Sequence, residues 1–433
     1  MTDIGYADDI ALLSSTFEGL QRLITSFCKY CHEHGLVVNA SKCEAMVFGA
    51  GNAWQNKRTW TLPVAGQGGP QPLAVVSQFK YLGLEVRGAA RSFRACAAHR
   101  HSRMRASQSA VHRRMKELRI PYDPDIVAGL FASITAAAGS YASEIWATPF
   151  LHRWHLKARE CAPQGYQAAI YKMCLGVPGS TGSLLAFFEM GRYPLQVQWL
   201  ARAVRYWNKL TREGQGSSLL AKVFKANVEH SLGHGRANCW AAELRAGLQF
   251  VCPNPGWTAH MLQARSIDDK MVQSAAQQAF SQQLQAFTDP PYGATCARRQ
   301  SCKYAAFMVP EGLGVDQDGM PRPAYLSTIA PTKQKRALAR LRLSAAPIQT
   351  NQTHAVPFLQ RRCTRCNRGV DTEHHLLFDC PALASTRAEF QSSLPLASRS
   401  MRALMSGVYD GDRVSRILAF VSRMIEAIPG PTA

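Results

Sequence analysis

Two adjacent acids near the start of the chain, Asp8 and Asp9, interrupt an otherwise apolar stretch. Because apolar residues flank them on both sides, residues 4–13 are predicted to form two short strands joined by a tight turn that carries both carboxylates. Paired carboxylates on such a turn can hold two divalent cations for phosphoryl or nucleotidyl transfer. An isolated Asp-Asp pair is more often a solvated turn, so the neighbouring elements must decide between the two interpretations.

The segments that follow predict a small unit of strands and one helix. Apolar residues recur at helical spacing at Phe17, Leu20, Ile24, Phe27 and Cys31. Ser15 and Glu18 fit a capping box at the start of this helix, and Gly35 is expected to end it. The segment "LVVNASKCEAMVFG" predicts strand, turn and strand, and "FKYLGLEV" (79–86) predicts another strand pair.

Beyond Gly88 the sequence is predominantly helical in propensity, which makes the predicted fold class α+β. Residues 211–330 contain Gln-rich helical stretches with Pro and Gly breaks. The last helix carries apolar residues from Val414 to Ile428 and is expected to stop at Pro429. We interpret Trp146, Trp199 and Trp207 as core residues of the helical region.

The chain is strongly basic, with 50 Lys and Arg against 29 Asp and Glu and a formal net charge of +21. A basic protein of this size most often acts on a polyanion, and nucleic acid is the leading candidate, with ribosomal-type or membrane-surface binding as alternatives. No run of about 18 apolar residues predicts a membrane span. The N-terminus lacks the basic and apolar regions of a signal peptide, so we expect an intracellular protein.

Positive charge is concentrated in residues 87–119, which hold ten Lys or Arg and one acid, Glu117. A solvated helix face normally carries acids for pairing at i,i+4, so we interpret this segment as a phosphate-binding surface with steep salt dependence. The candidate nucleic-acid-binding residues are Arg91, Arg94, Arg100, Arg103, Arg113 and Arg114.

One group among the thirteen cysteines has the spacing of metal ligands, and its members are Cys363, Cys366, His375 and Cys380. A C-x2-C knuckle presents two sulfurs from one turn, and Zn²⁺ prefers four tetrahedral ligands of thiolate and imidazole. His374 competes with His375 for the third position. The same stretch contains four arginines that could contact phosphates, namely Arg361, Arg362, Arg365 and Arg368.

A second set of metal-ligating residue types occurs earlier in the chain, at Cys28, Cys31, His34 and Cys43. The first three lie on one predicted helix, where steps of three residues drift around the axis and converge poorly on one ion. We therefore interpret them as core and surface residues.

Taken in order, the early segments resemble the last part of the palm of a reverse transcriptase: "YADDIALL", the amphipathic helix, "GLVVNASKCEAMVFG" and "FKYLG". The resemblance implies that Asp8 and Asp9 are catalytic carboxylates that bind Mg²⁺, and that Tyr6 lies beneath the primer end. It implies that Lys42 lies near the departing pyrophosphate, where an ammonium stabilises charge or donates a proton; an ordinary turn lysine is the alternative. Residues 81–83 resemble the primer-grip hairpin.

Later segments resemble non-LTR (LINE-type) retrotransposon polymerases. "GSYASEIW" (139–146) is similar to their thumb, and "YKMCLGVPGSTGSLLAFFEMGRYPL" with "RAVRYWNKL" to the helical region that follows. A group II intron-type polymerase shares the hairpin motif but fits the residues after 88 less well. The family's C-terminal pattern places four residues between histidine and the last cysteine, which favours His375.

The resemblance implies four regions: a partial palm (1–86), a thumb-like helical region (87–210), a helical connector of unknown role (211–330), and a basic segment with a zinc knuckle and a final helix (331–433). It implies RNA template, DNA primer or target DNA, and dNTPs as partners, Mg²⁺ and Zn²⁺ as cofactors, and a nuclear location. The resemblance also implies that the zinc knuckle helps to hold template RNA or target DNA.

Polymerases of this family use three carboxylates, and only Asp3 precedes the acid pair in this chain. We therefore expect that the fingers and the third catalytic carboxylate are missing, that Mg²⁺ binds weakly or not at all, and that this truncated polymerase does not synthesise DNA alone. The alternatives are a nucleic-acid-binding, zinc-containing module without catalysis, and an inert remnant.

Overall fold

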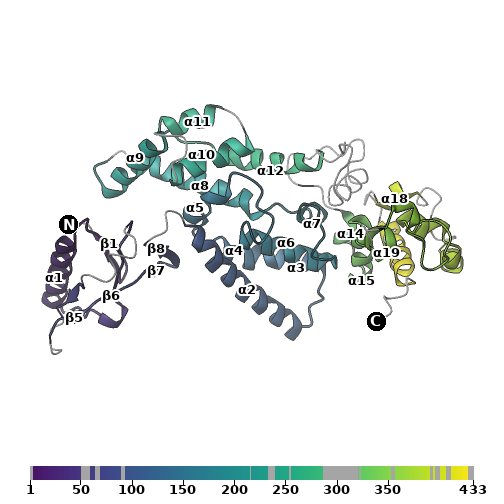
Figure 1. Ribbon diagram of the computed structural model, residues 1–433, viewed down its shortest axis with the longest axis horizontal. Helices are drawn as coiled ribbons and strands as arrows, with labels where there is room; N and C mark the ends of the chain where they lie inside the picture. The colour runs from purple at the N-terminus through teal and green to yellow at the C-terminus, as the bar shows by residue number, and fades with distance from the viewer. Residues whose placement is uncertain are drawn as a thin grey trace. The chain divides into compact units, whose positions relative to one another are not determined.

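The computed structural model describes residues 3–49, 59–63, 69–88, 93–214, 216–232, 239–252, 255–285, 320, 323–352, 356–390, 394, 400–405 and 411–427. Contacts divide the chain into two compact units, Met1–His99 and Arg100–Ala433. Every described strand lies in the first unit, and the second is built of helices (Figure 1). The predicted α+β fold class is confirmed.

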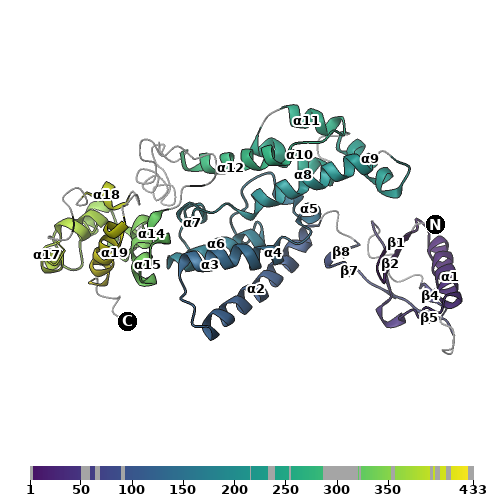
Figure 2. The ribbon, with the colours of Figure 1, turned by 180° about the vertical axis from the view of Figure 1, so that it is seen from behind.

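Four pairs of short strands and one long helix make up the first unit. The antiparallel pairs are β1 (Asp3–Tyr6) with β2 (Asp9–Leu12), β4 (Thr61–Leu62) with β5 (Gln71–Pro72), and β7 (Gln78–Tyr81) with β8 (Leu84–Arg87). The strands β3 (Glu44–Ala45) and β6 (Ala74–Val75) pair in parallel. The helix α1 (Phe17–Glu33) lies beside β4 and β5 (Figure 2). The two predicted hairpins and the helix are thus confirmed.

The core of the first unit forms where α1 packs on β4. Ile24 and Cys28 of the helix are buried with Trp60 and Leu62. Trp60 stacks on Phe17 with 4.7 Å between ring centroids, and its indole N–H donates to the Phe17 carbonyl at 3.1 Å. This small core fixes the end of β2, because Leu12 and Phe17 are both packed against it.

Two local predictions in this unit are wrong. The helix is capped by Thr16, whose hydroxyl accepts from the Gly19 amide at 3.1 Å, and not by Ser15. Residues 36–38 are not a strand, and Val37 is almost fully exposed. Within the described residues no strand pairs with this segment. Instead the Asn39 side chain accepts from the Ser41 amide at 3.2 Å and starts a 3₁₀ turn, Ala40–Lys42.

The second unit is a stack of helices that begins within α2. Its elements are α2 (Arg94–Glu117), α3 (Pro124–Leu130), α4 (Ala136–Gly139), α5 (Ser143–Trp146), α6 (Ala162–Leu175), α7 (Ser183–Met190), α8 (Leu195–Glu213), α9 (Leu219–Leu232), α10 (Trp240–Val251), α11 (Pro255–Leu262), α12 (Asp269–Gln285), α14 (Ala324–Ser327), α15 (Thr332–Arg342), α16 (Gln349–Gln352), α17 (Ala384–Ala388), α18 (Met401–Met405) and α19 (Gly411–Glu426). The predicted C-terminal helix is confirmed. None of the described helices is both long and apolar enough to pass through a membrane.

Tryptophans fill the centre of this unit. Trp146, Trp199 and Trp207 are fully buried, which confirms their interpretation as core residues. Trp146 and Trp199 meet edge to face with centroids 5.0 Å apart, and the Trp199 indole donates to the Ser140 hydroxyl at 2.8 Å. In the described part of 211–330, helices α9, α10 and α12 pack on α8, so this stretch contributes to the same core (Figure 1).

Buried ion pairs attach the C-terminal helices to this core. Arg342 at the end of α15 donates to both carboxylate oxygens of Glu189 in α7, at 2.7 and 3.1 Å, and Tyr325 of α14 also donates to Glu189. Lys335 pairs with Asp123, which caps α3. Removing one partner of such a pair leaves an uncompensated buried charge, so these contacts fix the position of α15.

Candidate metal centres and nucleic-acid interface

The acid pair lies on a hairpin with a two-residue loop. Tyr6 pairs with Asp9 across the hairpin, so Ala7 and Asp8 form the loop. Ala7 has a φ of 53°, and a positive φ at the first loop position is the pattern of a type II′ turn. For a residue with a Cβ this conformation costs about 1–3 kcal/mol, and such strain is concentrated at functional sites.

The hairpin is open on both sides. Within the described residues β1 and β2 pair only with each other, and Ile4, Tyr6 and Ile10 are exposed. An isolated two-stranded hairpin is marginal in water, so its contacts with the core at Leu12 carry much of its stability.

Asp8 and Asp9 are both exposed, and in the described part of the chain the carboxylate of neither has a hydrogen bond or an ion pair. Carboxylates are suitable ligands for Mg²⁺, and these two residues would hold it. No third acidic, histidine or cysteine side chain joins them in a cluster among the described residues. Asp3 lies at the far end of the hairpin, opposite Leu12. The acid pair therefore offers two ligand side chains and no more.

Lys42 is the exposed last residue of the 3₁₀ turn. Within the described residues no hydrogen bond or ion pair joins it to either aspartate. The loop of the second hairpin, Leu82 and Gly83, has a positive φ at both positions, 46° and 80°. This is the pattern of a tight type I′ turn, which Gly83 favours because it lacks a Cβ.

The basic helix α2 has one buried face and one charged face. Met104, Gln108, Val111 and Met115 lie on the buried face. The candidate residues on the exposed face are Arg94, Arg103, Arg113 and Arg114. These arginines lie where phosphates could reach them, whereas Arg91 lies outside the described residues.

Arg100 differs from the other arginines of α2. It is only 6% exposed, and its guanidinium carbon lies 5.0 Å from the centre of the Tyr141 ring. A guanidinium in this position forms a cation–π contact inside the helical unit. The Arg100 guanidinium is therefore occupied inside the helical unit and is not presented at the surface with the other arginines.

The cysteine and histidine group near the C-terminus forms a compact cluster. One ligand atom from each of Cys363, Cys366, His375 and Cys380 lies within 4.8 Å of all the others. The Cys363 and Cys380 sulfurs are 3.8 Å apart, and the Cys366 sulfur is 3.3 Å from His375 Nε2. A tetrahedron with Zn–S bonds of about 2.3 Å has S···S edges of about 3.8 Å, so the cluster fits Zn²⁺.

The electrostatics of the cluster also suit a cation. Burial raises the pKa of the Cys363 thiol to about 11, so its thiolate requires a nearby positive charge. Burial lowers the pKa of His375, which keeps the imidazole neutral and able to donate a lone pair at pH 7. The backbone amide of Arg368 donates to the Cys366 sulfur at 3.3 Å.

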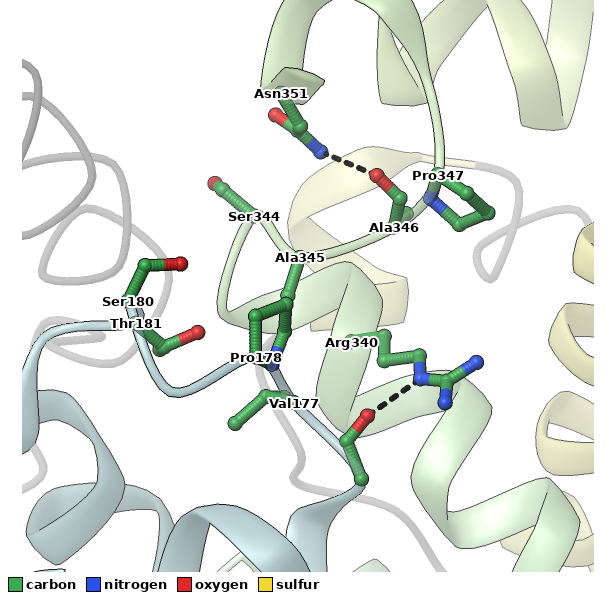
Figure 3. Close-up of a pocket in the computed structure, with 11 residues that line it drawn as sticks. Val177, Pro178, Ser180, Thr181, Arg340, Ser344, Ala345, Ala346, Pro347 and Asn351 are labelled. Carbon is green, nitrogen blue, oxygen red and sulfur yellow. Dashed lines mark hydrogen bonds between the residues drawn. The ribbon is translucent and has the colours of Figure 1, made fainter. Parts of the chain in front are cut away.

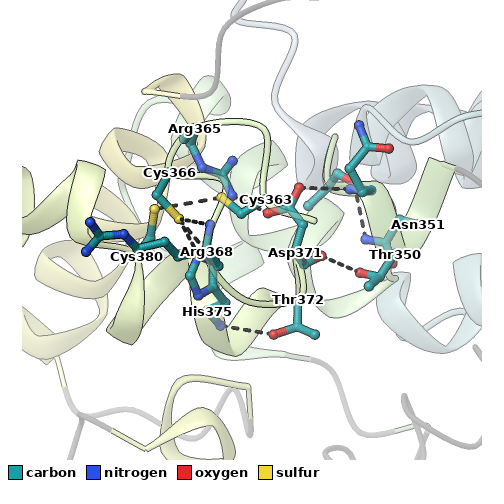
Figure 4. A network of polar contacts seen from close by, with 12 residues as sticks. Thr350, Asn351, Cys363, Arg365, Cys366, Arg368, Asp371, Thr372, His375 and Cys380 are labelled. Atoms are coloured by element: carbon teal, nitrogen blue, oxygen red, sulfur yellow. Dashed lines mark hydrogen bonds and ion pairs between the residues drawn. The ribbon is translucent and has the colours of Figure 1, made fainter. Parts of the chain in front are cut away.

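A hydrogen-bond network holds the ligand loops in place (Figure 4). Arg365 is buried against the Asp371 carboxylate, and Asp371 also accepts from the Gln349 amide at 2.9 Å. The Thr350 hydroxyl donates to the Asp371 carbonyl at 2.7 Å. Sequence spacing singled out the four residues of the cluster but not this support, because Arg365 alone resembles a free phosphate-binding residue.

The two histidines at 374 and 375 have different surroundings. His375 lies in the cluster, whereas the exposed His374 is outside it, with its Nδ1 2.7 Å from the Asp379 carboxylate. The earlier set of metal-ligating residue types forms no such cluster within the described residues. Cys28 and Cys31 are buried in α1, and Cys28 belongs to the small core.

A cavity of about 480 Å³ lies between the loop that follows α6 and the turn that follows α15 (Figure 3). Arg340 donates to the Gly176 carbonyl at 2.6 Å and so joins the two segments. The lining residues come from two segments, 176–181 and 340–351, and no motif in the sequence indicated that these segments form a cavity.

Comparison with known proteins identifies one region. Residues 2–86 match a family model described as Reverse transcriptase (RNA-dependent DNA polymerase). No match was found among curated proteins or among solved structures. The matched stretch contains both hairpins, α1 and Lys42. The part of the chain that carries the acid pair is therefore similar to a reverse transcriptase domain.

Proposed function

We propose that this chain belongs to the RNA-directed DNA polymerase of a non-LTR (LINE-type) retrotransposon and binds RNA template and DNA primer. The observation that carries the proposal is the Asp8–Asp9 pair on a two-residue hairpin loop inside the matched stretch 2–86. The LINE-type branch is supported by the order of the later segments in the sequence. By the same resemblance its site of action is the nucleus.

In this proposal Asp8 and Asp9 hold Mg²⁺, which when bound neutralises charge on the phosphates of a dNTP. Tyr6 supports the primer end, and Lys42 interacts with the departing pyrophosphate. The exposed arginines of α2, Arg94, Arg103, Arg113 and Arg114, bind phosphates of the template–primer duplex.

A second candidate function is nucleic-acid binding without catalysis. It is favoured by a contrast between the two candidate metal centres. The C-terminal cluster brings together four ligands with the spacing that Zn²⁺ requires, whereas the acid pair has two carboxylates and, within the described residues, no third ligand nearby. We therefore propose that the 433-residue chain alone binds template–primer but does not extend it.

Primer extension and binding should be measured in parallel on an RNA–DNA template–primer, with Mg²⁺ and dNTPs. We expect binding in the nanomolar to micromolar range at low salt and no extension. Extension that is lost in Asp8→Ala would show that the chain is a complete polymerase in function. Absence of binding would contradict both candidate functions.

A further inference from the structure

Two large apolar side chains are exposed close in sequence to the cysteine and histidine cluster. Phe358 and Leu359 lie in a 3₁₀ turn, Phe358–Gln360, and are 53% and 74% exposed. A solvent-exposed Phe-Leu pair forfeits the hydrophobic gain of burial, so a partner that covered both side chains would recover that gain. We call these two residues the apolar tip.

The apolar tip is held on a rigid base. Arg361 follows it directly and donates through Nε to the Val356 carbonyl at 2.8 Å and through Nη1 to the Thr350 carbonyl at 3.1 Å. The Asp371 amide donates to the Arg361 carbonyl at 2.8 Å. Because Asp371 also supports the loops of the cluster, the tip and the metal ligands share one framework.

The surroundings of the tip are positively charged. Residues 356–370 contain four arginines and no acid. Arg365 is paired inside the network, but Arg362 and Arg368 are exposed. The positive charge of these arginines would attract a polyanion to the tip and would repel a basic protein surface.

We propose that the apolar tip contacts unstacked bases of a single-stranded nucleic acid, while Arg362 and Arg368 bind the flanking phosphates. An aromatic ring accepts any base by stacking, and single strands leave base faces free, whereas a duplex covers them. The inference rests on the proposed nucleic-acid function and adds to it the preferred strandedness and the residues that contact bases.

The test compares Phe358→Ala, Phe358→Leu and Phe358→Trp in the full chain, with Ile329→Ala as the control. Ile329 is fully exposed in the same C-terminal region. Each protein is titrated with a single-stranded DNA, the same sequence as RNA, and the DNA duplex, each carrying 2-aminopurine. Zinc content per chain shows whether a variant has kept its fold.

We expect Phe358→Ala to weaken single-strand binding about 5- to 150-fold, the scale of one stacked base. Duplex affinity and the salt slope should stay unchanged because no charge is removed. Phe358→Leu should lose affinity in the same way, since it keeps the apolar bulk without the aromatic face. Phe358→Trp should retain both the affinity and the quenching of 2-aminopurine, and Ile329→Ala should behave as wild type. The DNA and RNA titrations show which strand is preferred.

Three results would overturn the inference. Unchanged single-strand binding in Phe358→Ala would show that the tip does not contact bases. Equal losses on single strands and duplex, or full affinity in Phe358→Leu, would rule out stacking. If wild type binds the oligonucleotides and every Phe358 variant binds them equally well, only this inference fails. If wild type binds no oligonucleotide, the proposed function fails as well.

Discussion

The side chains of His374 and His375 are neighbours in sequence and have opposite surroundings. His375 belongs to the cluster, with its Nε2 3.3 Å from the Cys366 sulfur, whereas His374 is exposed and paired with Asp379. The pattern of spacing leaves both as candidate ligands, since a shift of one residue changes each interval by only one. The direction in which each ring points depends on the turn His375–Asp379, which spacing does not describe.

Zinc content should separate the two histidines. We expect His375→Ala to lose most of the bound zinc, because only three ligands would remain. His374→Ala should keep the zinc content of wild type, and it serves as the matched control. The measurement is zinc per chain by elemental analysis after dialysis against a weak chelator. Equal losses in both variants, or a loss only in His374→Ala, would contradict the ligand set Cys363, Cys366, His375 and Cys380.

Residue type alone did not distinguish free arginines from buried ones. Arg100 and Arg365 belong to basic stretches of the sequence, and on that basis both are predicted to bind phosphates. In the structure Arg100 packs on Tyr141 and Arg365 pairs with Asp371. Tyr141 is 41 positions from Arg100 in the sequence, so its contact could not be inferred from local pattern. Arg103, Arg113 and Arg114 remain exposed because they lie off the buried face of α2.

At the scale of elements, the sequence pattern correctly predicted those helices and hairpins that are stabilised by residues near one another in the chain. The two hairpins and α1 follow from alternating apolar residues and helical spacing, and the structure confirms them. The predicted strand at 36–38 failed because a strand requires a partner elsewhere in the chain. The shift of the helix cap from Ser15 to Thr16 is one residue, and either hydroxyl could have served.

The pairing of α7 with α15 depends on one buried carboxylate. Glu189→Gln would leave Arg342 buried without a counter-charge, and we expect a loss of about 3–5 kcal/mol in the free energy of unfolding. Urea denaturation followed by circular dichroism measures this change. Glu213→Gln, which removes an exposed partner of Lys209, should change stability by less than about 0.5 kcal/mol. Comparable effects of the two substitutions would show that the buried pair is not a structural anchor.

A histidine links α2 to the segment before α3 and makes their association sensitive to pH. His112 Nε2 lies 2.7 Å from the Gln108 side-chain nitrogen and 2.7 Å from the Tyr122 hydroxyl. An amide nitrogen can only donate, so Nε2 accepts and must be unprotonated. Desolvation by burial lowers the pKa of His112 in the folded chain below 6.5.

The stability that His112 contributes is therefore fully present above pH 6.5 and is lost as the pH falls through the lowered folded pKa. In His112→Gln the amide oxygen can accept the same hydrogen bonds without titrating. We expect its midpoint of thermal unfolding to decrease less than that of wild type between pH 7 and pH 5. Parallel midpoints of the two proteins over this range would contradict a role for His112.

At the scale of the whole molecule, the net charge of +21 matters less than its distribution. Arg103, Arg113 and Arg114 lie on the exposed side of one helix, whose single acid, Glu117, pairs with Arg114 at 3.0 Å. On α8 and α9, by contrast, Lys209 and Lys225 lie within 4.0 Å of Glu213 and Glu229, which partly neutralise them. Composition predicted a polyanion partner, but only the structure shows which basic residues are exposed.

Binding of an RNA–DNA hybrid should reveal this difference through its salt dependence. Each arginine–phosphate contact contributes about 0.9 to the slope of log K against log salt. The triple variant Arg103→Gln, Arg113→Gln, Arg114→Gln should reduce that slope by about 2 to 3. The matched control, Lys209→Gln, Lys222→Gln, Lys225→Gln, removes the same charge from α8 and α9 and should leave the slope nearly unchanged. Equal reductions would mean that net charge, rather than the exposed face of α2, attracts the nucleic acid. A slope close to zero in wild type would remove α2 from the interface altogether.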